Sequence, residues 1–138
     1  EADTSAEAPD TGIDYPDRDP DFVQETPVIP QLSQIYRLSG DKVAFHVDPE
    51  VAKMAGFDTP IMHGLCTYGV ICKAVVDRCA DGDARRLLSF RGRFASPAFC
   101  GQTIVTKIWK EQDRYLVQAE SKDSGQVLFT ASQAKLRD

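Results

Sequence analysis

The sequence lacks the long apolar run that a membrane-spanning helix requires, because no stretch approaches the ~20 residues needed to cross a bilayer. It also lacks the basic stripe interleaved with aromatic side chains that is typical of a nucleic-acid-binding surface. Its 138 residues, of which 42% are hydrophobic and 27% are charged, suit one globular domain. We therefore expect a globular protein with neither a membrane span nor a nucleic-acid partner.

The sequence lacks a Cys-x-x-Cys pair, because no two of its four cysteines have that spacing. Cys66, Cys72 and Cys79 fall in one apolar stretch, and Cys100 lies apart. A zinc site needs closely paired ligands, and a secreted scaffold spreads its cysteines over loops. The sequence therefore predicts reduced, mostly buried thiols, no metal site and an intracellular, cytoplasmic location.

Charge is distributed unevenly along the chain. Residues 1–30 contain nine acidic residues, one basic residue and five of the eight prolines, whereas residues 31–138 contain twelve acidic and fifteen basic residues. A polar, Pro-rich segment cannot bury a core. Residues 1–29 are therefore predicted to be an acidic linker or flexible arm and residues 30–138 the folded domain. The positive balance of this domain suits a small molecule that carries phosphate.

Two helices are predicted in the first half of the domain. Asp48 followed by Pro49 is typical of a helix start, and Gly56 is placed to end the short helix over residues 48–55. Apolar side chains recur at spacings of three and four residues over residues 64–79. This pattern predicts a longer helix that is largely enclosed.

Beyond the second helix, the period of the apolar pattern changes to two. Four strands are expected, separated by turn sequences, near residues 88–94, 103–110, 115–120 and 127–136. An antiparallel meander with one apolar face needs a cover, and the long helix is the obvious one. The predicted class is α+β.

Two polar side chains in a non-helical segment are candidates for acid–base chemistry. Asp41 and His46 lie five residues apart, and Gly40 predicts a turn before them. An imidazole takes up a proton near neutral pH and a carboxylate can orient a water molecule, so the pair could act on one water. The alternative is a turn acid beside an unreactive histidine.

The start of the long helix is the second candidate element. Gly64 lies where N–H groups are unpaired and the helix dipole is positive, so its N–H could stabilise a developing oxyanion. The alternative is a glycine that only eases the turn. His63 is a competing candidate for the base, although a histidine here more commonly packs beside the helix start.

Several separated blocks of residues identify a family. They are Tyr36, Leu38-Ser39-Gly40-Asp41, His46, Asp48-Pro49, Ala55-Gly56-Phe57, Pro60-Ile61 and His63-Gly64-Leu65-Cys66-Thr67, then Arg93-Phe94, Ser96-Pro97 and Gly101. In this order they resemble the MaoC-like dehydratase, or R-specific enoyl-CoA hydratase 2, family. The resemblance covers roughly residues 30–138.

The resemblance implies a hot-dog fold, in which an antiparallel sheet wraps around one long central helix. It implies that Asp41 and His46 are the catalytic pair and that the Gly64 N–H is the oxyanion donor. The implied lyase reaction, in fatty acid metabolism such as β-oxidation, is the hydration of a trans-2-enoyl-CoA to the (R)-3-hydroxyacyl-CoA and the reverse dehydration. It needs no metal or redox cofactor, because coenzyme A enters as part of the substrate.

One departure from the family pattern lies between the catalytic residues. Val43 stands where the family has an Asn in the pocket, and a valine side chain cannot form a hydrogen bond. We expect a weakened hydratase, the alternative being a non-catalytic subunit that binds acyl thioesters and completes a partner's site. Val43 and His63 are counted among the substrate-binding positions. Arg91 and Arg93 are candidates for phosphate contact, or else ordinary exposed strand arginines.

Family organisation implies a partner. Many members are two fused hot dogs with the catalytic motif in the C-terminal half, so this chain is expected to be such a half. It would pair with a missing N-terminal half or with a second copy as a homodimer. A peroxisomal location is the alternative if it comes from a eukaryotic multifunctional enzyme.

A thioesterase would need a carboxylate facing the central helix, and Asp77 is the only candidate.

Overall fold

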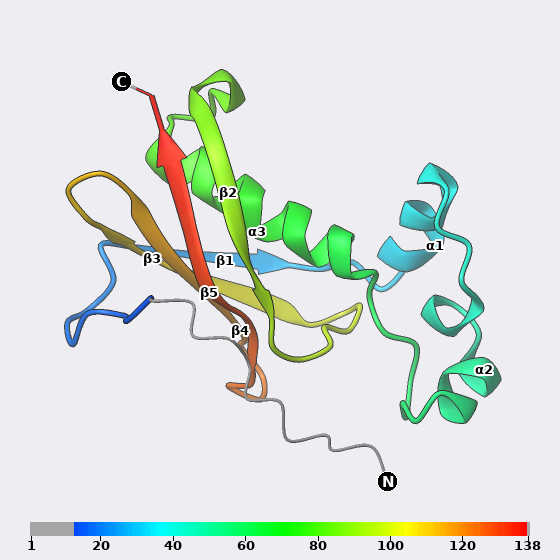
Figure 1. Cartoon of the computed structure of the whole chain (residues 1–138). Coiled ribbons are helices and arrows are strands. Elements are labelled where there is room, and N and C mark those ends of the chain that lie inside the picture. Colours follow the sequence, from blue (N-terminus) through cyan, green and yellow to red (C-terminus); the bar gives the residue numbers. More distant parts are fainter. Residues whose placement is uncertain (1–12, 138) are drawn as a thin grey trace, which may run out of the picture.

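The computed structural model describes residues 13–137, which form one antiparallel sheet with a long helix against it (Figure 1). The five strands have the spatial order β1-β3-β4-β5-β2. They are β1 (Phe22–Pro27), β2 (Leu87–Phe94), β3 (Thr103–Lys110), β4 (Tyr115–Ser121) and β5 (Val127–Leu136). The helix is α3 (Gly64–Cys79). This arrangement confirms the predicted α+β class and the hot-dog fold.

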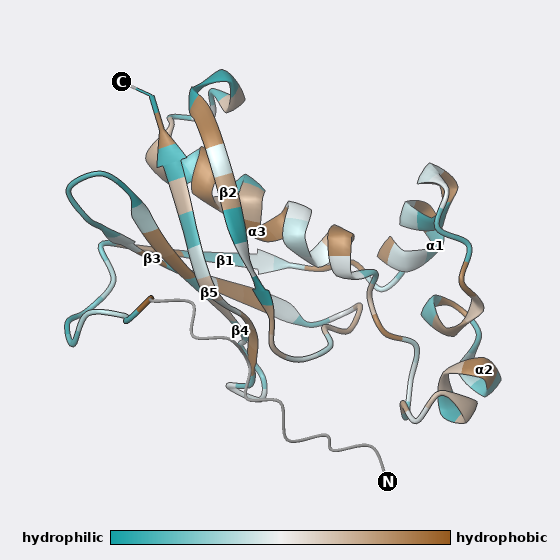
Figure 2. Cartoon of the chain, in the orientation of Figure 1, coloured by the Kyte–Doolittle hydropathy of each residue, from teal (hydrophilic) through white to brown (hydrophobic). Residues whose placement is uncertain are grey.

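The core lies between α3 and the sheet. Apolar side chains at helical spacing on α3 meet the inward side chains of β3, β4 and β5, and hydrophobic residues recur along these elements in Figure 2. Burying each large apolar side chain contributes roughly 1.5–3 kcal/mol. The side chains with 0% exposure include Ile71, Val75, Ile104, Ile108, Val117 and Phe129.

The face of α3 that turns away from the sheet is open in the single chain. Leu65 is 68% exposed, and Gly69 and Lys73 are also exposed. The prediction of a largely enclosed helix is therefore correct for the face toward the sheet and wrong for the opposite face. An exposed leucine at the start of a central helix leaves apolar surface for another protein element to cover.

Short helices form a separate group beyond the N-terminal end of α3 (Figure 1). The Asp48 carboxylate accepts hydrogen bonds from the N–H groups of Glu50 at 2.9 Å and Val51 at 3.3 Å, which confirms the predicted start of the short helix. Gly56 has a φ of 88°, which confirms its predicted end. The group comprises α1 (Leu32–Tyr36), η1 (Arg37–Ser39), η2 (Ala44–His46) and α2 (Pro49–Met54); η3 (Ala84–Arg86) lies apart, before β2.

Strand β1 corrects the prediction of a linker over residues 1–29. It pairs with β3 from Phe22↔Ile108 to Pro27↔Thr103 through main-chain hydrogen bonds. Every second side chain of β1 stays exposed, as is usual for a strand at the edge of a sheet. The Tyr15 hydroxyl donates to the Val117 carbonyl at 2.7 Å, which ties the preceding segment to the sheet as well. Residues 1–12 of the predicted arm lie outside the described residues.

Strands β2 and β5 pair antiparallel and approach closely at Gly92. A Cβ atom on Gly92 would lie 2.3 Å from the Ser132 Cβ and 2.5 Å from the Phe129 ring, so only glycine fits here. The register shifts between Arg91 and Arg93, and Ala131 on β5 has a φ of 47°. The β2 edge is therefore bent, which sets the direction in which its end approaches the start of α3.

All four cysteines are free, as predicted. Only Cys66 is fully buried, whereas the other three are partly buried, so the prediction of mostly buried thiols holds in part. Burial raises the pKa of Cys66 and Cys79 to about 11. None of the helices within residues 13–137 combines the length and the apolar character that a membrane span requires.

Candidate active site

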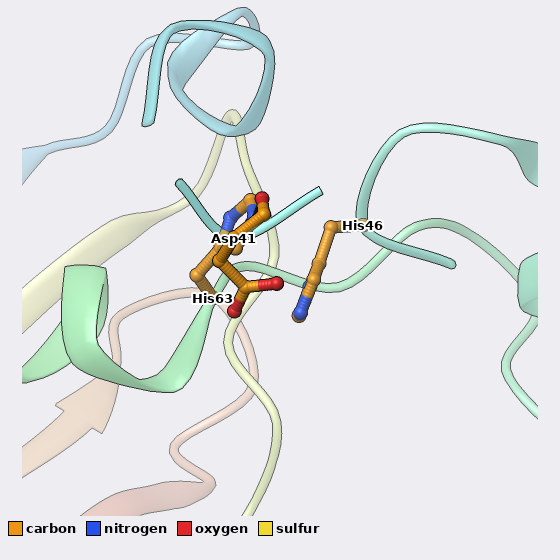
Figure 3. A group of neighbouring side chains, drawn as sticks. All are labelled: Asp41, His46 and His63. Carbon is orange, nitrogen blue, oxygen red and sulfur yellow. Dashed lines mark hydrogen bonds between the residues drawn. The ribbon is translucent and has the colours of Figure 1, made fainter. Parts of the chain in front are cut away.

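The polar side chains predicted to carry chemistry meet where the short helices join the start of α3. Asp41, His46 and His63 each offer one oxygen or nitrogen atom within 4.8 Å of the others (Figure 3). His46 and His63 are 7% and 1% exposed, whereas Asp41 is exposed. The structure therefore brings the predicted pair together and adds a second histidine directly beside it.

The Asp41 carboxylate is held by its own segment. Gly40 has a φ of 126°, which is strained for any other residue and allows the chain to turn sharply after η1. The Val43 N–H donates a hydrogen bond to Asp41 Oδ1 at 3.2 Å. In Figure 3 the carboxylate extends toward the ring of His46. Asp41 can therefore accept a further hydrogen bond from a water molecule beside that ring.

The tautomer of His46 follows from its partner. His46 Nδ1 lies 2.8 Å from the Ile61 carbonyl oxygen, and a carbonyl only accepts, so Nδ1 carries the proton. The remaining nitrogen, Nε2, then has a free lone pair when the ring is neutral. A buried imidazole with a fixed tautomer and a free lone pair is suited to accept a proton.

His63 touches both members of the pair. Its Nε2–H donates to the main-chain carbonyl of Asp41 at 3.1 Å, and its ring stacks on His46 with 3.8 Å between centroids and 22° between planes. Its Nδ1 is buried without a hydrogen-bond partner. Burial is the largest influence on His63 and lowers its pKa, so the ring is neutral near pH 7.

The same three side chains could be considered as metal ligands. The lone pair of each imidazole nitrogen lies in the ring plane, and the rings of His46 and His63 are stacked with 22° between their planes. Lone pairs in two nearly parallel planes do not converge on one point. A tetrahedral metal site needs ligands that converge. The geometry therefore favours a water molecule held by Asp41 and His46 over a metal ion.

A cavity of about 470 Å³ opens in front of His46. Both His46 and Gly64, the first residue of α3, form part of its wall. The N–H groups of the first helical turn have no partner within the helix, so the positive end of α3 faces this space. The wall is mainly apolar and consists of Phe45, His46, Ile61, Met62, Gly64, Thr67, Phe94, Ala95, Ser96, Pro97 and Ala98.

The remaining predicted positions lie away from this cavity. His63 is too deeply buried to offer a surface to a substrate, so its predicted direct contact is revised. Val43 is 49% exposed and does not line the cavity, although its N–H donates to Asp41. Arg91 and Arg93 line a separate hollow of about 260 Å³ on β2, and their contact with phosphate stays a prediction. Asp77 lies near the other end of α3, paired with Lys73.

Sequence reasoning missed the contribution of the main chain. The Ile61 carbonyl fixes the His46 tautomer. The segment around Ile61 pairs with the segment around Phe99, where the Met62 N–H donates to the Ala98 carbonyl at 2.7 Å. The pattern around Pro60 and Ile61 marked the segment, but a backbone acceptor has no side-chain signature. Phe94 was identified as part of a strand and of a family block but not as a site residue, yet its ring lies 3.5 Å from where a Gly64 Cβ would be.

The fold and the site together define a hot-dog protein with a carboxylate–imidazole pair at the N-terminal end of its central helix. Residues 13–131 match the MaoC like domain family, and the chain belongs to this family. It is 44% identical over 115 residues to enoyl-CoA hydratase ChsH3 of Mycobacterium tuberculosis, a match that covers 82% of this chain and 40% of the relative. It is 39% identical over 118 residues to peroxisomal multifunctional enzyme type 2 of Mus musculus, which covers 86% of this chain and 16% of that one.

Solved structures agree with this assignment. The crystal structure of a MaoC-like dehydratase from Phytophthora capsici superposes with a TM-score of 0.89 and 41% identity, over 96% of this chain and 46% of that one. The chain thus spans less than half the length of each of these relatives.

Proposed function

We propose that this chain is the catalytic part of an (R)-specific enoyl-CoA hydratase, which adds water to trans-2-enoyl-CoA and catalyses the reverse dehydration in fatty acid metabolism. The observation that carries the proposal is that His46 and Gly64, at the start of α3, share the wall of one apolar cavity, with Asp41 directly beside His46. An apolar wall suits an acyl chain, and the polar groups lie at one end of it. Relatives named enoyl-CoA hydratase support the reaction class.

The arrangement allows a balanced addition of water. A water molecule held by the Asp41 carboxylate and His46 Nε2 loses one proton to the pair as its oxygen forms a bond to C3 of the enoyl group. The electrons of the double bond move toward the thioester, and the Gly64 N–H stabilises the charge on its oxygen. A proton from the pair then reaches C2, so one water is consumed and the pair is restored.

We propose that no resident metal or redox cofactor takes part, and that coenzyme A is present only as part of the substrate. Addition of water to an enoyl thioester needs a base, an acid and an oxyanion donor, and the site offers all three among its own groups. Arg91 and Arg93 remain candidates for the phosphate groups, on the β2 edge.

A second hot-dog unit, either a missing N-terminal half or another copy, is the proposed partner. The open face of α3, with Leu65 at 68% exposure, and the unpaired edge of β2 are the surfaces that such a unit would cover. One solved structure with the same fold is a complex of two proteins, ChsH1 and ChsH2, at 15% identity. Size-exclusion chromatography of the chain alone, and with the N-terminal part of the full protein, tests this pairing.

For its location we propose the cytoplasm, with the peroxisome as the alternative. Relatives from Mus musculus and Arabidopsis thaliana carry peroxisomal in their names, which supports the alternative. Imaging of the full protein fused to a fluorescent protein, beside a peroxisomal marker, distinguishes the two.

The alternative function is a non-catalytic subunit that binds acyl thioesters and completes a partner's site. Val43 favours it, because its side chain supplies no hydrogen bond to the segment that holds Asp41. Hydrolysis of the thioester is a weaker candidate, because Asp77, the carboxylate it would use, lies away from the cavity and pairs with Lys73.

The decisive experiment is a hydration assay with crotonyl-CoA and a longer enoyl-CoA, in the presence and absence of the partner half. We expect loss of enoyl absorbance without release of thiol. Asp41→Asn should lower kcat ~10²–10⁴-fold, as expected for removal of a positioned acid–base group. Asp77→Asn is the matched control and should leave kcat unchanged. No turnover under any condition would support the subunit alternative, and thiol release that Asp77→Asn abolishes would support hydrolysis.

A further inference from the structure

The segment that carries Asp41 is weakly attached to the rest of the molecule. In the part of the chain that the structure describes, the hydrogen bonds of residues 37–45 all join partners at most four residues apart, with one exception. The exception is the bond from His63 Nε2–H to the Asp41 carbonyl, which spans 22 positions. The position of the exposed Asp41 relative to α3 therefore depends on His63.

The His63 ring also supports the second member of the pair. It contacts the rings of Tyr36, at 4.9 Å between centroids, and His46, at 3.8 Å. His46 is thus supported on its face by His63 and at Nδ1 by the Ile61 carbonyl. With one side chain bonded to the Asp41 main chain and stacked on the His46 ring, the two groups cannot shift independently.

We propose that His63 is a positioning residue, which holds the Asp41 main chain and the His46 ring in the relative placement that proton transfer requires. This inference rests on the proposed hydratase function. His63 is not the base itself: its Nε2 is occupied by a carbonyl, its Nδ1 is enclosed, and it does not border the cavity. It acts through Asp41 and His46.

The choice of a histidine here is informative. A phenylalanine would fill the same space and stack in the same way, without leaving Nδ1 buried and unpaired. The histidine therefore carries a cost that packing alone does not require, and what it adds is the Nε2–H donor. Burial keeps the ring neutral, so it stacks on His46 without repelling the proton that His46 must accept.

Two variants separate the functions of the ring. His63→Phe keeps an aromatic ring against His46 and Tyr36 but removes the donor to the Asp41 carbonyl. His63→Gln keeps an N–H donor at comparable reach but removes the ring. We expect His63→Phe to lower kcat ~10–100-fold with little change in KM for crotonyl-CoA, since a misplacement of ~1 Å costs about that much. His63→Gln should recover part of this loss. A kcat for His63→Phe equal to that of the wild type would overturn the proposal.

A second measurement does not depend on turnover. Hydrogen–deuterium exchange of peptides covering residues 37–45 should be faster in His63→Phe than in the wild type, with His63→Gln between them, while α3 exchanges as before. Unchanged exchange in His63→Phe contradicts the proposal, and so does faster exchange throughout the chain, which would indicate a role in folding only. If the wild type is inactive but the exchange result holds, the proposed function fails and the positioning stands. If Asp41→Asn loses activity but His63→Phe does not, the proposed hydratase function stands and the positioning role of His63 fails.

Discussion

The sheet with α3 and the short helices before it are built on different principles. The sheet and α3 share a core of fully buried side chains with continuous strand pairing, such as the seven residue pairs between β3 and β4. The short-helix segment instead exposes apolar side chains, with Leu38 at 82% and Met54 at 80% exposure, and relies mainly on local hydrogen bonds. The acid–base pair belongs to the second region.

This difference indicates how stability and function are divided. The sheet and α3, which form the strongly packed region, fix the position of the start of α3. The short helices, which form the weakly packed region, place Asp41 and His46 next to it. The two are joined at the site by few contacts, chiefly the Ile61 carbonyl to His46 and His63 to Asp41. Substitutions in the first region should therefore affect unfolding, and substitutions in the second should affect turnover.

The largest expected effect on stability is in the core. Phe129→Ala removes a ring with 0% exposure that contacts Phe90, Phe94 and Tyr68. It should lower the free energy of unfolding by ~3–5 kcal/mol, measured by urea denaturation. Leu38→Ala, in the short-helix region, is the control and should change it by less than ~0.5 kcal/mol. Similar losses in the two variants would contradict the conclusion that the sheet and α3 supply most of the stability.

A smaller effect should appear as a dependence of stability on pH. Burial lowers the pKa of His63 in the folded chain below its ordinary value of 6.5, so the unfolded chain binds this proton first as the pH falls. Above pH 6.5, His63 therefore does not lower the free energy of unfolding. As the pH falls below 6.5, the unfolded chain takes up the proton more readily and the free energy of unfolding decreases. Urea denaturation of the wild type and His63→Phe at pH 7.5 and at pH 5.5 (roughly one unit on either side) should show a smaller pH effect in the variant. An equal effect in both would exclude His63 as its source.

Much of the strongly packed region could be predicted from the sequence, because its side-chain periods are set by burial. The bounds of α3, β3 and β5 agree with those read from helical and alternating patterns. Strand β1 was missed because its acidic, Pro-rich surroundings concealed the alternation of Phe22, Gln24 and Thr26. An edge strand half exposed to solvent has too few apolar residues to be distinguished from a linker.

The candidate site was predictable to a different extent. Asp41, His46 and Gly64 were found because their side chains, or the lack of one, belong to a recognisable motif. The structure places His46 and Gly64 in the wall of one cavity and Asp41 beside His46. The role of His63 could not be inferred, because it depends on a main-chain carbonyl and a ring stack that only the fold creates. The sequence predicted which side chains are present and not how they are held.

A modest effect is expected from the cap of α2. Asp48→Ala removes the acceptor for the N–H groups of Glu50 and Val51 and should cost ~0.5–2 kcal/mol of local helix stability. Because α2 belongs to the weakly packed region, the change should appear as faster amide exchange in residues 49–54 while the strands keep their protection. Asp58→Ala, an exposed carboxylate between α2 and α3, is the matched control. Loss of protection in the sheet as well would show that the two regions unfold together.

The smallest expected effect concerns Val43, in the segment that carries Asp41. Its N–H already supports Asp41, and this contact is independent of the side chain. Val43→Asn adds a side-chain hydrogen-bonding group near the pair, and one additional bond in the transition state is worth at most about tenfold in kcat. We therefore expect a modest rise in crotonyl-CoA turnover with unchanged KM and unfolding free energy, and Val43→Thr serves as the control of similar shape.

A rise confined to Val43→Asn would identify Val43 as a residue that limits an intact acid–base pair. If the wild type is inactive and Val43→Asn restores nothing, the pair is not used for hydration, and the weakly packed region serves to bind a thioester for a partner's site.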